Sequence, residues 1–164
     1  MKRFSSSVVA SVVLLGGLSL VIGSTRTALA QSDSSIGTWK LNVAKSKYVP
    51  GPAPKSNLVT MVAAGKGIKV TTKGTDADGK PTATEYTANY DGKDVPVKGG
   101  VGYDTLSLKR IDANTVETTR KNAGKVVQTL RSVVSADGKT RTTTTTGTDE
   151  KGRKINNVAV FDKQ

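Results

Sequence analysis

The residue types that carry most enzyme chemistry are scarce in this chain. Its 164 residues include no His and no Cys, so the commonest general base, the thiolate nucleophile and the usual zinc ligands are missing. The paired acids Asp91 with Asp94, and Asp149 with Glu150, fall in turns, where aspartate is favoured because it bonds to nearby backbone. The sequence therefore predicts a protein that is not an enzyme, with no catalytic residue, no metal site and no cofactor.

Two arginines are the candidates for holding an anion. Arg120 shares one face of its segment with Val116 and Thr118, and Arg131 shares a face of the next segment with Thr129. A guanidinium enclosed in a barrel would bind an anion through charge-assisted hydrogen bonds. Arginine side chains are seldom fully buried, so an outward position on the surface is the alternative for each of them.

Short Thr- and Val-rich segments cut by Gly turns must position these side chains. Asp-Gly-Lys recurs at 78–80, 91–93 and 137–139, and Asp-Gly is a strong hairpin signal because both residues tolerate positive φ. Three prolines between 50 and 54 favour an extended strap over 44–55, with at most one helical turn at 44–47. The predicted strands are 36–43, 57–64, 67–75, 83–90, 95–98, 103–110, 114–121, 125–135, 139–148 and 154–162.

The short connections between these segments make neighbouring strands antiparallel, and a flat sheet of that size would leave two exposed edges. The predicted fold is all-β, an antiparallel up-and-down meander closed into a barrel of 8–10 strands. Thr142 to Thr146 place hydroxyls on both faces of one strand. Either the interior is a partly wet cavity, or this strand lies at a barrel edge with both faces solvated.

The first thirty residues have the pattern of a secretory signal peptide. Lys2 and Arg3 precede an apolar run over 8–22, and Ala28-Leu29-Ala30 forms a small-residue cleavage site. The run is shorter than the roughly 20 residues that cross a bilayer. We expect cleavage after Ala30, a periplasmic or secreted product without a membrane span, and one domain over 31–164.

The chain is strongly basic, with 25 Lys and Arg against 13 Asp and Glu. Loss of Lys2, Arg3 and Arg26 with the leader leaves 22 basic residues and a net charge of about +9. Such a surface either keeps β edges from pairing or attracts an anionic envelope polymer. Nucleic acid is not expected as a partner, because export removes the protein from it and aromatic residues are few.

One segment resembles a known family. Gly37-Thr38-Trp39-Lys40-Leu41 resembles the Gly-x-Trp opening of the calycins, the lipocalins and fatty-acid-binding proteins, and 158–163 is similar to the last strand of the latter. The resemblance spans most of 36–163, and the same start is found in small secreted bacterial proteins of unassigned function. It departs in two places. The Pro-rich strap stands where the fatty-acid-binding proteins have a helix pair, and Ala159 and Phe161 stand where they have a carboxylate-binding Arg-x-Tyr.

The resemblance implies a barrel that binds a small apolar or amphipathic ligand. The residues predicted to line its site are Trp39, Leu41, Tyr86, Leu106, Leu108 and Phe161, together with Arg120 and Arg131. A slip of one residue in any strand would turn its side chains to the other face. The alternative is an interaction module with a solid core, whose basic surface binds an anionic envelope polymer.

Overall fold

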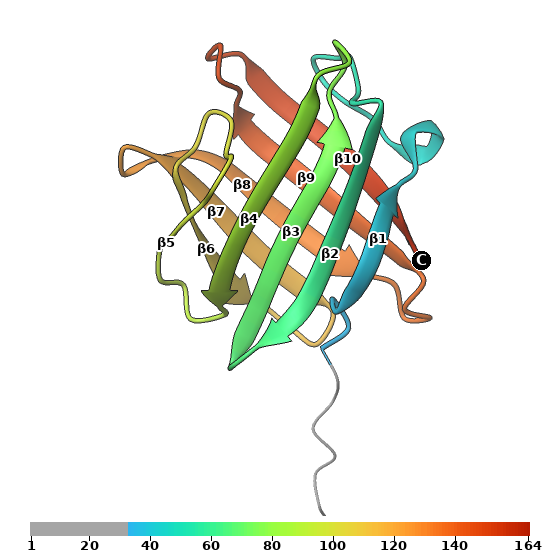
Figure 1. The fold of residues 1–164 in the computed structure, drawn as a ribbon, viewed down its shortest axis with the longest axis vertical. Coiled ribbons are helices and arrows are strands. Elements are labelled where there is room, and N and C mark those ends of the chain that lie inside the picture. Colours follow the sequence, from blue (N-terminus) through green and yellow to red (C-terminus); the bar gives the residue numbers. More distant parts are fainter. Residues whose placement is uncertain (1–32) are drawn as a thin grey trace, which may run out of the picture. The chain divides into compact units, whose positions relative to one another are not determined.

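The computed structural model describes residues 33–164, which form the strands of one sheet (Figure 1). The predicted signal peptide lies outside the described residues. A single 3-10 turn, η1 (Val43–Lys45), follows the first strand and is capped by the Asn42 side chain, which accepts a hydrogen bond from the Lys45 N–H. The strands are β1 Gly37–Leu41, β2 Ser56–Ala64, β3 Gly67–Thr75, β4 Pro81–Asn89, β5 Val95–Pro96, β6 Thr105–Arg110, β7 Thr115–Asn122, β8 Lys125–Val134, β9 Thr140–Thr148 and β10 Lys154–Lys163.

The strands follow one another around the sheet in the order β4-β3-β2-β1-β10-β9-β8-β7-β6-β5, and every pair is antiparallel. β1 pairs with β2 on one side and with β10 on the other, so the two ends of the domain meet inside the sheet. The predicted all-β meander is confirmed, and each strand boundary lies within two residues of the position expected from the turns.

The barrel is nearly closed, at a seam between β4 and the β5–β6 side. Here the continuous hydrogen-bond ladder found between the other neighbouring strands is replaced by two isolated β-bridges, Glu85 with Lys98 and Asp91 with Lys109. Glu85 and Lys98 exchange backbone hydrogen bonds of 3.0 and 2.9 Å. Gly99 adopts a φ of +73°, and a Cβ there would lie 2.1 Å from the Ala83 carbonyl oxygen. Only glycine allows this close approach of the loop to β4.

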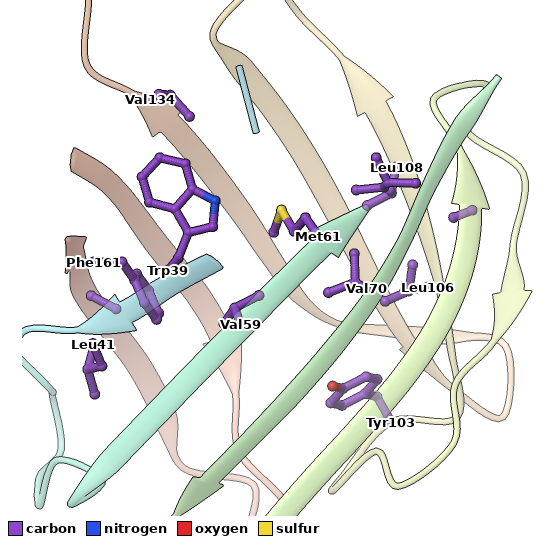
Figure 2. Packing of buried hydrophobic residues seen from close by; sticks show 13 residues of the cluster. Trp39, Leu41, Val59, Met61, Val70, Tyr103, Leu106, Leu108, Val134 and Phe161 are labelled. Atoms are coloured by element: carbon purple, nitrogen blue, oxygen red, sulfur yellow. The ribbon is translucent and has the colours of Figure 1, made fainter. Parts of the chain in front are cut away.

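The apolar core gathers on the inner faces of β1, β2, β3, β6 and β10, as Figure 2 shows for Trp39, Val59, Met61 and Val70. Trp39 is fully buried, and its Nε1 donates a 2.8 Å hydrogen bond to the Ser35 carbonyl oxygen. Buried indole N–H groups need such a partner, because an unpaired one costs free energy on folding. The first strand is thus tied to the segment that precedes it.

That preceding segment closes one end of the barrel through Asp33. Its carboxylate accepts hydrogen bonds from Ser35 Oγ at 2.6 Å, from the Tyr90 hydroxyl and from the Arg110 guanidinium. Arg110 also stacks over the Tyr90 ring at 3.8 Å. Burial alone would raise the pKa of Asp33, but the hydrogen bonds from Ser35, Tyr90 and Arg110 outweigh it and lower the pKa below 3.8. Burial and the bond to Asp33 raise the pKa of Tyr90 to about 12.

Replacing Asp33 by Asn should lower the free energy of unfolding at neutral pH by about 1–3 kcal/mol, because charge-assisted hydrogen bonds to Tyr90 and Arg110 are lost. The pKa of Asp33 is depressed in the folded state, so its contribution is complete above 3.8 and disappears as pH falls through the folded value. Urea titrations at pH 7 and at a series of pH values below 3.8 should therefore show the difference between the two proteins shrinking as the pH falls. Asp78→Asn, an exposed turn variant, is the control, and equal effects at 33 and 78 would contradict this role.

Substituting Ala for Gly99 should open the seam. Gly92 has a similar φ of +75°, but nothing lies within 4 Å of a Cβ placed there, so Gly92→Ala carries the same backbone strain without the clash. We expect Gly99→Ala to cost about 1–3 kcal/mol more than Gly92→Ala in urea unfolding. Amide exchange at Glu85 and Lys98 should speed up in the first variant only, and equal stability of the two would count against the close approach.

Candidate functional site

The inner faces of the strands enclose a cavity of about 320 Å³. Ser34, Ser35, Tyr90 and Arg110 line it at the end closed by Asp33, and Tyr48 and Pro54 of the strap line it elsewhere. Its remaining wall comes from alternate residues of every strand from β2 to β4 and from β6 to β10. A protein interior packed to ordinary density leaves no void of this size, so the barrel is hollow.

Threonine hydroxyls face this cavity, and several of them bond to each other. Thr143 and Thr145 point inward from β9, and Thr143 Oγ1 lies 2.9 Å from Ser132 Oγ of β8. Thr72 and Thr84 of β3 and β4 are paired in the same way at 2.5 Å. β9 is flanked by ladders on both sides, so it is not an edge strand. Of the two readings of the threonine-rich strand, the partly polar interior is the one found.

Arg141 begins the inward face of β9 and is the most deeply buried charge of the described chain, with 5% of its surface exposed. Its guanidinium lies 4.6 Å from the Phe161 ring and 5.6 Å from the Trp39 ring, and Nη1 donates to Met61 Sδ at 3.4 Å. Its Nε has no hydrogen-bond partner within residues 33–164. Burial lowers the pKa of Arg141 to about 10, so it remains charged at neutral pH.

Arg120 also reaches the cavity, from β7, and unlike Arg110 it has no acidic partner. Its Nη1 donates to Gln128 Oε1 at 2.9 Å, and Gln128 in turn donates to the Thr148 carbonyl oxygen. The guanidinium lies 4.3 Å from the Tyr103 ring. As with Arg141, the buried Nε of Arg120 lacks a partner in the described part of the chain.

No carboxylate neutralises these two cations from the cavity wall. The residues that line it include no Asp and no Glu, and the ion pairs of the described chain do not involve Arg120 or Arg141. Tyr86 of β4 also faces the cavity. Burial raises the pKa of its hydroxyl, while the charges of Arg120 and Arg141 act in the opposite direction. The site therefore offers several hydrogen-bond donors and an excess of positive charge.

The structure divides the predicted site residues into three groups. Tyr86, Leu108, Arg120 and Phe161 line the cavity. Trp39, Leu41 and Leu106 are buried in the core, but they are not among the residues that line the cavity.

Arg131 stands apart, because it is exposed on the outer face of β8 and does not contribute to the interior. Its neighbours Leu130 and Ser132 point inward, so alternation along the strand sends Arg131 out. Together with Arg120, Arg141 is instead the interior cation without an acidic partner, and it was not predicted from the sequence. The alternation of Arg141, Thr143 and Thr145 along one face was the signal that could have found it.

No known protein family matches this chain, and no curated protein matches its sequence. Among solved structures it is similar to the zebrafish ileal bile acid-binding protein, crystallised in complex with cholic acid. The two chains are 11% identical, the match covers 80% of this chain and 99% of the other, and the TM-score is 0.48. A likeness at this level carries no argument about family, ligand or function.

Residues 33–164 contain neither a membrane-spanning helix nor a cluster of metal ligands. No helix in this part of the chain is long and apolar enough to cross a membrane. No group of three or more acidic, His or Cys side chains in it is arranged to hold a metal ion.

Replacing Arg141 by Met should stabilise the protein without ligand. A buried cation pays a desolvation penalty that its contacts with Met61 and the aromatic rings only partly offset, so we expect the free energy of unfolding to rise by about 1–3 kcal/mol. Arg131→Met on the outer face should change it by less than about 0.5 kcal/mol. Denaturant titrations of both variants make the comparison, and a destabilised Arg141→Met would mean that the cation contacts outweigh the desolvation penalty.

Proposed function

We propose that the protein binds a small amphipathic ligand inside the barrel and holds its anionic group with the interior arginines. The observation that carries this proposal is Arg141, which faces the cavity at 5% exposure with an unpartnered Nε and no neutralising acid on the cavity wall. Burying an unpaired charge is costly, and natural chains keep such a charge where a partner completes it. A carboxylate or similar group on a ligand would be that partner.

The two walls of the cavity suit a molecule with one apolar and one polar side. Val59 and Met61 of β2, with Ile68 and Val70 of β3, supply hydrocarbon. Strands β7, β8 and β9 lie behind β2 and β3 in Figure 1. Asn57 and Thr72 are the polar lining residues of β2 and β3, and β7, β8 and β9 supply a larger set of polar groups. Those polar groups are Thr118, Arg120, Gln128, Ser132, Arg141, Thr143 and Thr145. Binding of apolar surface to the first wall would give most of the free energy, and the second wall would orient the ligand.

Binding without turnover is the activity that these residues support. A general base or nucleophile needs a group that gives up or accepts a proton near neutral pH, and the cavity wall offers arginine, tyrosine and hydroxyl side chains. The predicted signal peptide over 1–30 supports a location in the periplasm or outside the cell. The protein would bind its ligand in that compartment. Attachment of the basic outer surface to an anionic envelope polymer stays a prediction of the sequence.

A fluorescent amphipathic anion tests the proposal. Anilinonaphthalene sulfonate should bind to the purified protein, brighten, and receive energy from Trp39, the only tryptophan of the chain. Arg141→Met should weaken this binding by about tenfold or more, because a charge-assisted hydrogen bond contributes about 1.5–3 kcal/mol.

Arg131→Met is the matched control, since it removes the same charge from the outer face, and its affinity should stay within twofold of the unmodified protein. Mass spectrometry gives an independent test. The protein is purified under native conditions and then denatured, and an acidic amphiphile should be detected among the released compounds. The proposal fails if the probe does not bind and nothing is released, or if both variants bind the probe as well as the original.

A further inference from the structure

Three arginines line the cavity, and two of them, Arg120 and Arg141, have no acidic partner, whereas Arg110 is paired with Asp33. Arg141 contacts Met61, Phe161 and Trp39, and Arg120 contacts Gln128 and Tyr103, so the two guanidinium groups share no protein partner. Each keeps a buried Nε that no atom of the described chain satisfies. Arg141 is buried and Arg120 is half-buried. Charged side chains are almost never buried without a partner, so two unsatisfied Nε groups in one cavity are unusual.

The register of the strands places these positions toward opposite ends of one wall. Arg120 lies opposite Gln128, which lies opposite Gly147 of β9. Arg141 lies six residues before Gly147 on the same strand and opposite Val134. At about 3.3 Å per residue, the two backbone positions are about 20 Å apart along the wall. Tyr86 on β4 also lines the cavity, and the charges of both arginines lower the pKa of its hydroxyl against the larger effect of burial.

A ligand with one acidic group would neutralise only one of these positions. Between them the wall is formed by Thr118, Leu130 and Thr143, and no carboxylate is present to balance the other charge. A ligand acidic at both ends would pair with both arginines while its body lies along the apolar wall of β2 and β3.

We infer that the cavity is built for a dianionic amphiphile, a molecule of the long-chain dicarboxylate class with one acidic group at Arg120 and the other at Arg141. This inference rests on the proposed function, because it assigns the ligand class of the same cavity. The proposed function needs only one negative charge on the ligand. The present inference requires in addition that a second negative charge strengthens binding.

Calorimetric titration with matched acids tests this requirement. Dodecanoic acid and dodecanedioic acid have chains of equal length and differ by one carboxylate, and the monomethyl ester of the diacid restores the single charge at nearly the same size. The diacid should bind to the unmodified protein at least tenfold more tightly than the monoacid, and the monomethyl ester should bind like the monoacid. Diacids of 8 to 16 carbons should show an optimum length that reports the spacing of the two arginines.

Variants locate the effect. Arg120→Gln and Arg141→Gln should each reduce the preference for the diacid to threefold or less, whereas Arg131→Gln should leave it unchanged. Circular dichroism checks that each variant is folded, and the ester comparison in the unmodified protein needs no variant. Equal affinity for diacid and monoacid overturns the two-charge inference and leaves the proposed function standing. Failure of all three ligands to bind overturns the proposed function itself.

Discussion

The pairing of β1 with both β2 and β10 is the interaction on which the rest of the molecule depends. Without it the sheet would separate into a three-stranded piece, β2–β4, and a second piece running from β10 to β5. Trp39 lies at the centre of this short strand, opposite Val59 on one side and Lys163 on the other, and is fully buried. Five residues thus join segments from the two ends of the domain, and the burial of one indole stabilises the joint.

A hollow interior follows from what this sequence places on its inward positions. Aromatic residues make up only 4% of the chain, and inward positions on β3, β4, β7 and β9 carry threonine where a bulkier apolar side chain would fill space. The hydroxyls satisfy each other across strands, as Thr72 and Thr84 do, so the cavity wall is polar without costly unpaired groups. Arg120 and Arg141, each with an unpartnered Nε, are the exceptions within residues 33–164.

The turns made the fold predictable from the sequence, because each Asp-Gly or Gly-Lys step fixes a hairpin and therefore the register of two strands. Alternation then placed Tyr86, Leu108 and Phe161 on the inside. Arg141 escaped prediction because it follows Lys139 and Thr140 at a turn, where a basic residue is expected to be solvated.

Other features depend on contacts between residues far apart in the chain. Asp33, for example, meets Arg110 across 77 positions. Local patterns carry no information on such contacts. The curvature that brings them together is set by the packing of all the strands.

The seam between β4 and the β5–β6 side has a consequence for self-association. It is the place in the described barrel where another chain could add a strand, since an unpaired sheet edge is a template for aggregation. The bridges at Glu85 and Asp91 leave only a short stretch of β4 between them, too little for a stable intermolecular ladder. On the other side Pro96 has no backbone N–H to offer, and β5 is only two residues long. The barrel thus has an incompletely hydrogen-bonded seam without exposing a long strand edge to which another chain could pair.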